Sequence, residues 1–294
     1  MTTFDAFLSC KSVSTDTRNI IPGSVFFALK GARFNGNEFA AEALQQGASF
    51  AVVDEPVGED PRFIYVENVL AALQDCARSY RRYLDIPVVG LTGSNGKTTN
   101  KELFHAVLGK KFKVHSTPGN FNNHIGVPLT ILGIPEGTEM AIIEMGANHL
   151  GEIAELCEIA QPTLGLITNI GRDHIGLFGG VGAIIESNLE LYNYLRDHNH
   201  NVFVHKESNM LMKYAKGIKS SNKSVINNML ELATKAKSCG LKVNAGHDLC
   251  LDNLEYLRKM DIIDEVSIGH SIIVDALNYG FDDTIKRYIE IIKG

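Results

Sequence analysis

A glycine-rich stretch that follows an apolar run, "PVVGLTGSNGKTTNKEL" at residues 87–103, constrains the fold of this chain most strongly. The β-branched pair Val88 and Val89 predicts a strand, and the residues from Lys97 onward predict a helix. A strand, a glycine-rich loop and a helix N-terminus in this order predict an anion site built from backbone N–H groups. The candidate nucleotide-binding residues are Gly93, Ser94, Asn95, Gly96, Lys97, Thr98 and Thr99.

The loop departs from the strict phosphate-loop pattern, because Leu91 stands where that pattern has its first glycine. The necessary parts are nevertheless present. Glycines let backbone amides face phosphates, the Lys97 ammonium neutralises charge, and a hydroxyl of Thr98 or Thr99 can reach Mg²⁺. The alternative is a glycine-rich turn beside a solvated lysine. The strand–loop–helix setting favours nucleotide binding.

Short apolar segments alternate with helical patterns from Val88 to about residue 204. This alternation predicts a parallel sheet covered by helices on both faces. Composition and pattern divide the chain into three predicted domains, at residues 1–84, 85–217 and 218–294. The polar stretch "KGIKSSNKSVINN" marks the junction between the last two. We therefore expect an α/β protein of more than one domain.

The charge and the cysteines exclude several classes of protein. The formal net charge is −6, so the sequence offers no basic surface for nucleic acid. The five cysteines are scattered and form no CxxC pair, which is typical of thiols in a reducing compartment. The N-terminus does not resemble a signal peptide, and no apolar stretch approaches the length of a membrane span. We expect a cytoplasmic protein without membrane insertion.

Several motifs resemble the Mur ligase family of peptidoglycan synthesis, and the resemblance runs from about residue 10 to about residue 217. The stretches "GNFNNHIGVPLT" and "EMGANHLGEI" are most similar to the family member that adds D-alanyl-D-alanine. The stretch from Ser14 to Ala48 resembles that member's UDP-sugar-binding domain. The motifs are "GLTGSNGKTT" (90–99), "STPGNFNNHIGVPLT" (116–130), "IIEMGANHLGEI" (142–153) and "LITNIGRDH" (166–174).

The resemblance implies carboxylate activation by ATP. ATP would phosphorylate the terminal carboxylate of UDP-MurNAc-tripeptide, and the amine of D-Ala-D-Ala would attack the acyl phosphate. ATP and Mg²⁺ are the implied cofactors. The implied catalytic residues are Lys97, Glu144 and His174, and the implied magnesium ligands are Thr98, Glu144 and His174. An exposed strand-end Glu144 and a structural His174 are the alternatives.

The same resemblance implies residues that hold the substrate: Thr17, Arg18, Lys30, Asn122 and Asn123. Arg18 is the expected diphosphate contact, since a planar guanidinium suits phosphate oxygens. From the residues alone, Arg18 is a surface arginine, and the pair Asn122–Asn123 is only a turn signal.

The chain departs from the family at its second metal site. Asn188 stands where the family carries a lysine, typically carbamylated, that ligates the second Mg²⁺. Gly176 stands where the family usually has Glu. A neutral asparagine offers one weakly ligating carbonyl. We expect this site to be weak or absent, at a rate cost on the order of a thousandfold.

The end of the chain also departs from the family. The family's central domain continues past residue 217, and a C-terminal domain closes over ATP; we expect neither here. Residues 224–294 instead resemble the end of the pyridoxine 5′-phosphate synthase family. We expect two βα units of a TIM-barrel type, with His247 and His270 as ordinary loop histidines.

These patterns and resemblances predict a fold of three parts. They are a small N-terminal α/β UDP-sugar-binding domain, an incomplete P-loop-type parallel-sheet ATP-binding domain, and the two βα units. One hypothesis is that the tail strands extend the central sheet. The alternatives to a ligase are a pyridoxine phosphate synthase partner and a nucleotide-binding module without turnover.

Overall fold

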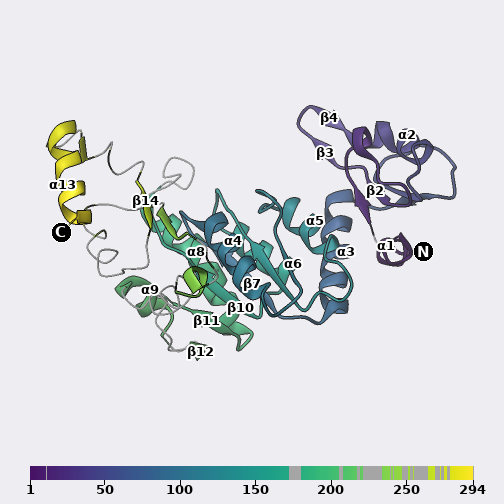
Figure 1. Cartoon of the computed structure of the whole chain (residues 1–294). Helices are drawn as coiled ribbons and strands as arrows, with labels where there is room; N and C mark the ends of the chain where they lie inside the picture. The colour runs from purple at the N-terminus through teal and green to yellow at the C-terminus, as the bar shows by residue number, and fades with distance from the viewer. Residues whose placement is uncertain are drawn as a thin grey trace. The chain divides into compact units, whose positions relative to one another are not determined.

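The computed structural model describes fourteen stretches of the chain and divides them into two compact units. Unit 1 consists of residues 1–202 and 214–219, and unit 2 of residues 203–213 and 220–294. Figure 1 shows the elements of both. The described residues are 1–10, 12–171, 180–204, 208–216, 219–220, 234–238, 240, 242–246, 251, 254, 264–268, 272, 275–276 and 279–293.

A six-stranded sheet with the order β12-β11-β10-β7-β9-β8 forms the centre of unit 1. β7 pairs in parallel with β10 on one side and with β9 on the other, and β8 pairs in parallel with β9. Every residue of β7 is buried. The parallel sheet predicted from the alternating pattern is confirmed. The strands are β7 (Val88–Thr92), β8 (Val114–Ser116), β9 (Met140–Glu144), β10 (Leu164–Ile167), β11 (Asn201–Phe203) and β12 (Lys219–Ser220).

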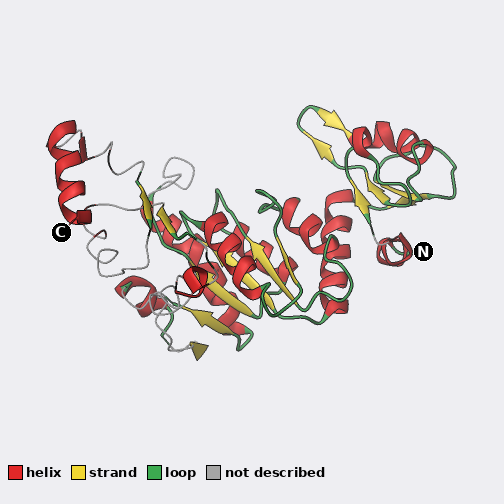
Figure 2. Cartoon of the chain, in the orientation of Figure 1, coloured by secondary structure: helices red, strands yellow, loops and turns green. Residues whose placement is uncertain are grey.

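Helices flank this sheet, as Figure 2 shows in red beside yellow strands. α4 packs against β7, β8 and β9, whereas α8 packs against β10 and β7. α6 contacts α3, α5 and α8. Because chain order changes side at β7, the loop after β7 lies where open α/β sheets bind ligands. The helices are α3 (Val69–Leu84), α4 (Lys97–Leu108), α5 (Gly126–Leu132), α6 (Glu152–Ala160) and α8 (Val181–Asp197).

The N-terminal part of unit 1 contains a second parallel sheet, with the order β1-β2-β5-β6. Phe26 and Val53 of this sheet are buried against α2 and its neighbours. The sequence pattern did not predict α1, β1, β6 or α5. The remaining elements are α1 (Thr3–Cys10), β1 (Val13–Ser14), η1 (Thr17–Asn19), β2 (Val25–Phe27), β3 (Lys30–Gly31), β4 (Phe34–Asn35), η2 (Gly36–Phe39), α2 (Ala40–Gln45), β5 (Phe50–Val53) and β6 (Phe63–Tyr65).

Beyond β12, the described strands of the tail are β13 (Asn244–Gly246) and β14 (Glu265–Ser267), which pair in parallel with each other in a separate two-stranded sheet. The hypothesis that the two tail strands extend the central sheet is therefore wrong for the described residues. Helices α9 (Asn209–Tyr214) and α13 (Phe281–Lys293) also lie within the described stretches. Among the helices of the described stretches, none has the length and apolar character required to cross a bilayer.

Candidate functional site

The predicted phosphate loop connects the end of β7 to the start of α4 and requires glycine at two positions. Gly93 has φ +137° and Gly96 has φ +73°, which L side chains rarely adopt. A Cβ atom at Gly93 would also lie 2.0 Å from the hydroxyl of Thr168. The loop can therefore keep this path only with glycine at position 93.

The segment that follows β10 braces the phosphate loop. The backbone N–H of Ser94 donates to the carbonyl of Asn169 at 3.0 Å, and the N–H of Asn95 donates to the side-chain oxygen of Asn169 at 3.0 Å. The Thr168 hydroxyl donates to the Asn95 carbonyl at 2.6 Å, and the N–H of Gly171 donates to Ser94 Oγ at 2.8 Å. Two loop amides are thus engaged within the protein. The amides of the first turn of α4, which the helix does not use, are better placed for phosphate.

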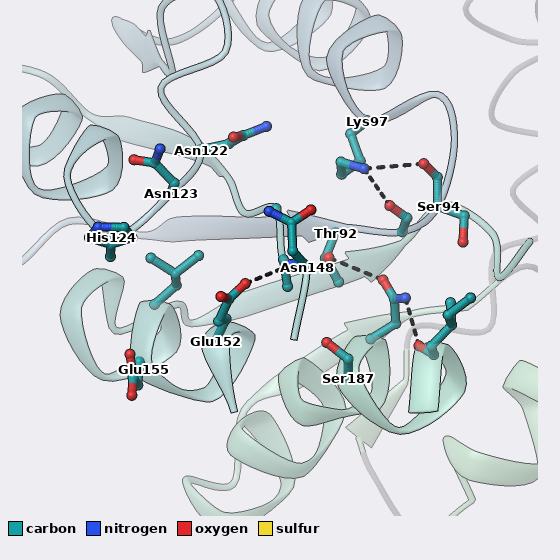
Figure 3. A pocket seen from close by; sticks show the side chains of 16 residues that line it. Thr92, Ser94, Lys97, Asn122, Asn123, His124, Asn148, Glu152, Glu155 and Ser187 are labelled. Carbon is teal, nitrogen blue, oxygen red and sulfur yellow. Dashed lines mark hydrogen bonds between the residues drawn. The ribbon is translucent and has the colours of Figure 1, made fainter. Parts of the chain in front are cut away.

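The Lys97 ammonium lies back over its own loop, as Figure 3 shows. It donates to the carbonyl of Gly93 at 2.6 Å and to the carbonyl of Ser94 at 3.2 Å. These bonds keep a positive charge beside the N-terminus of α4, whose dipole also favours an anion. A phosphate oxygen would compete with two neutral carbonyls for this ammonium, and a hydrogen bond between two opposite charges is the stronger one.

Glu144 ends β9 as a buried carboxylate with one oxygen left over. Its Oε1 accepts from Asn122 Nδ2 at 2.9 Å and from the Thr98 hydroxyl at 3.3 Å. Its Oε2 is buried and has no hydrogen-bond partner. A buried carboxylate oxygen without a partner is costly, so this oxygen is available for a cation.

The donors around Glu144 fit a magnesium ion. Mg²⁺ is commonly bound by one or two carboxylates together with substrate phosphates and water. The hydroxyl of Thr98, in the first turn of α4, lies beside the Glu144 carboxylate. The described part of the chain contains no cluster of three or more His, Cys, Asp or Glu side chains that could hold a metal alone. The third ligand expected from the sequence, His174, lies outside the described residues, as do Gly176, His247 and His270.

The two asparagines expected on the substrate side have different environments. Asn122 points its amide nitrogen at Glu144, and its backbone carbonyl accepts from the N–H of Gly146 at 2.8 Å. The amide oxygen of Asn123 accepts from the N–H groups of Ile125 and Gly126 at the start of α5. Asn123 is exposed.

A cavity of about 380 Å³ lies at the mouth of the loop. Figure 3 shows its side chains coming from β7, the phosphate loop, the 122–124 segment, the start of α6 and from α8. The sequence did not single out Thr92, Asn148, Glu152 or Ser187. The lining residues are Thr92, Gly93, Ser94, Lys97, Asn122, Asn123, His124, Gly146, Ala147, Asn148, Glu152, Glu155, Leu156, Ile184, Ser187 and Asn188.

Asn188 lines this cavity, but both ends of its amide are engaged. Its Oδ1 accepts from the Thr92 hydroxyl at 3.2 Å, and its Nδ2 donates to the carbonyl of Ile184 at 2.9 Å. The side chain is buried and neutral. The position therefore supplies neither a charge nor an uncommitted oxygen toward the cavity.

The residues expected at the UDP-sugar lie in the N-terminal part, outside this cavity. Arg18 makes a two-pronged contact with Asp16, and its hydrogen bonds hold the pKa of that carboxyl at about 2. Thr17 shares the short helix η1 with Arg18. Lys30 forms ion pairs with Asp54 at 2.9 Å and Glu55 at 2.8 Å.

Comparison with protein families gives three matches along the chain. The Mur ligase middle domain matches residues 91–250, and the Mur ligase family, catalytic domain, matches residues 9–81. The pyridoxal phosphate biosynthesis protein PdxJ matches residues 210–294. The first and last matches overlap at residues 210–250.

Curated proteins similar to this chain include UDP-N-acetylmuramoyl-tripeptide--D-alanyl-D-alanine ligases. The one from Bacillus subtilis is 45% identical over 188 residues, covering 63% of this chain and 41% of the relative. The one from Escherichia coli is 37% identical over 190 residues, covering 65% and 42%. The chain thus spans about two fifths of the length of these curated relatives.

Among solved structures, the MurF ligase from Thermotoga maritima in complex with ADP is 31% identical with a TM-score of 0.67, covering 75% of this chain and 51% of that one. MurF from Acinetobacter baumannii is 29% identical with a TM-score of 0.67, covering 74% and 52%.

Proposed function

Because the chain belongs to the Mur ligase family, we propose that it binds ATP at the 93–99 loop and joins D-Ala-D-Ala to UDP-MurNAc-tripeptide. One observation carries the proposal. The Glu144 carboxylate, buried and with one oxygen unpaired, lies 3.3 Å from the Thr98 hydroxyl in the first turn of the helix that follows the loop. This is the arrangement that a nucleotide with its cation requires.

The proposed reaction has two steps. An oxygen of the tripeptide carboxylate attacks the γ-phosphorus of ATP and ADP leaves, giving an acyl phosphate. The amine of D-Ala-D-Ala then attacks the acyl carbon, inorganic phosphate leaves, and the amine loses a proton to solvent. Lys97 and the first-turn amides of α4 would stabilise the negative charge on the transferring group.

A magnesium ion would be held by Thr98 and Glu144, with His174 as a further proposed ligand. When bound, Mg²⁺ neutralises charge on the phosphates. Asn122 would orient Glu144 through its 2.9 Å bond, and Asn123 would face the acceptor peptide. Thr17, Arg18 and Lys30 are proposed to hold the UDP-sugar. To bind the sugar nucleotide, the Arg18 guanidinium would have to leave Asp16 at least in part, and the Lys30 ammonium would have to leave Asp54 and Glu55.

A second candidate, a nucleotide-binding module without turnover, is favoured by Asn188. Its amide is bonded to Thr92 and Ile184, so the position offers no charged ligand for a second cation. We propose that this loss slows phosphoryl transfer by about a thousandfold, since one metal that stabilises the transferring group contributes several kcal/mol.

A phosphate-release assay separates the two candidates. Full-length protein is given ATP, Mg²⁺, UDP-MurNAc-tripeptide and D-Ala-D-Ala, and Asn188→Lys is compared with the unsubstituted chain. We expect slow, substrate-dependent release from the unsubstituted chain and faster release from Asn188→Lys. Asn193→Lys, an exposed position on the same helix, is the matched control and should change nothing.

The outcomes assign the candidates. Release that needs both acceptor substrates supports the ligase. ADP binding without release from either protein supports the module. Absence of nucleotide binding by the unsubstituted chain contradicts both.

The tail carries a separate proposal, that residues 218–294 form two βα units of a TIM-barrel type. The parallel pairing of β13 with β14 and the PdxJ match support it. We propose no synthase activity, because two units supply a quarter of a barrel. An ATP-driven reaction agrees with the cytoplasmic location expected from the cysteines.

A further inference from the structure

Lys101 is a fully buried lysine in α4, and the proposed reaction does not use it. Its ammonium donates to the carbonyl of Thr117 at 2.7 Å and to the carbonyl of Gly119 at 3.4 Å. It also lies 3.1 Å from the carboxylate of Glu102, whose side chain is 65% exposed. Removing an ammonium from water is costly, so the bonds that hold it in this place are specific features of the fold.

Thr117, the main partner of Lys101, is bonded to the strand that carries Glu144. The N–H of Thr117 donates to the carbonyl of Ile142 at 3.0 Å. Its hydroxyl accepts from the N–H of Glu144 at 2.9 Å, and both groups are buried. The ammonium of Lys101 is therefore linked through one residue to the backbone of Glu144.

The loop that begins at Thr117 also returns to Glu144 by its other end. Five residues further on, Asn122 donates to Glu144 Oε1, and its carbonyl accepts from Gly146. Figure 3 shows Asn122 among the side chains that line the cavity. The 117–122 segment thus contacts both the backbone and the carboxylate of Glu144.

The spacing along α4 couples these contacts to the nucleotide site. Thr98 and Lys101 are three residues apart and therefore lie on the same face of the helix. Thr98 contacts the Glu144 carboxylate, and Lys101 holds the loop that supports it. A shift of α4 relative to the loop would disturb both ends of the cation site.

We propose that Lys101 is a positioning residue. Its ammonium fixes α4 against the 117–122 segment and so holds Thr98, Glu144 and Asn122 in the arrangement that binds a divalent cation with the nucleotide. This role rests on the proposed nucleotide site. The contact with Glu102 contributes little, since an exposed carboxylate forms a weak ion pair.

Binding of ADP and Mn²⁺ to the full-length protein tests the role. In Lys101→Met, which keeps most of the length of the unbranched side chain without its charge, ADP binding without metal should be nearly unchanged. Mn²⁺ binding to the ADP complex, followed by electron paramagnetic resonance, should weaken about tenfold or more, as for other residues that orient metal ligands. Glu102→Gln, which keeps the ammonium and its carbonyl partners, should bind Mn²⁺ as the unsubstituted chain does.

A second variant reaches the same link from its other side. Thr117→Val removes the hydroxyl that accepts from Glu144 and keeps the β-branched shape, so it should show the same selective loss of Mn²⁺ affinity. The double variant should bind Mn²⁺ with the same affinity as whichever single variant binds it less tightly, because both changes break one chain of contacts. If Lys101→Met does not fold, Thr117→Val alone decides.

The possible failures are distinguishable. If the unsubstituted chain binds no ADP, the proposed function is wrong. If it binds ADP and Mn²⁺ and the folded variants bind Mn²⁺ equally well, Lys101 has only a structural role and the inference is overturned. A loss of thermal stability with unchanged Mn²⁺ affinity overturns it in the same way.

Discussion

Single residues at the phosphate loop have backbone requirements that the sequence reveals and packing requirements that it does not. Glycines before a lysine and a helix predict a loop with positive φ, and Gly93 and Gly96 adopt such values. The contact of Gly93 with Thr168 was not predictable, because these residues come from different strands. The same is true of the bond between Asn95 and Asn169, which are 74 positions apart.

Gly93→Ala should abolish ADP binding and lower the free energy of unfolding by about 2–4 kcal/mol. The reason is that alanine is strained at this positive φ and its Cβ atom would clash with Thr168. Gly23→Ala is the control, since Gly23 also has positive φ, at +81°, but has open space around it. Urea denaturation and ADP titration measure both effects. Equal destabilisation in the two variants would show that the 2.0 Å contact is relieved without cost.

At the scale of elements, each end of α6 is held by a charged side chain from a neighbouring helix. Glu190 of α8 accepts from the N–H groups of Gly151 at 2.7 Å and Ala154 at 2.9 Å. Arg81 of α3 donates to the carbonyls of Ala160 at 2.9 Å and Gln161 at 3.1 Å. A carboxylate at the N-terminus and a guanidinium at the C-terminus both match the helix dipole. The loop before α6 lines the cavity, so these contacts also support the site.

Arg81→Met should lower the free energy of unfolding by about 2–4 kcal/mol, because it leaves two terminal carbonyls of α6 without their buried donor. Arg82→Met, at the exposed neighbouring position, should change it by less than about 0.5 kcal/mol. Chemical denaturation compares the two. A similar small effect from both would mean that water replaces the guanidinium at the end of α6.

The elements that the sequence predicted are those with strong local signals, and α5 shows why others were missed. Its residues Gly126–Leu132 include Pro128 and β-branched side chains, which are poor helix formers. The helix forms because it is almost wholly buried and Asn123 accepts from its first N–H groups. Gly126 is required there, since a Cβ atom would lie 2.4 Å from the backbone of Phe121. Tertiary contacts of this kind leave no local pattern.

At the scale of the whole molecule, the matches to two family models overlap within one chain. The Mur ligase match ends at residue 250 and the PdxJ match begins at residue 210, whereas compact unit 2 takes in residues 203–213 and 220–294. All six strands of the central sheet end by Ser220, and so do the phosphate loop, Glu144, Asn122 and Asn188. The proposed nucleotide site therefore uses no side chain from the tail strands.

A chain that ends at Ser220 should consequently fold and bind ADP with Mg²⁺ as the full-length protein does. Its own core, built on the six-stranded sheet, is large enough to unfold in one cooperative transition. Calorimetric unfolding and ADP titration check this, with full-length Gly93→Ala as the reference for lost binding. If the shortened chain stays soluble but loses ADP affinity, nucleotide binding depends on the tail. If the shortened chain fails to fold, the parts of the chain before and after residue 220 depend on each other for stability and form one folding unit.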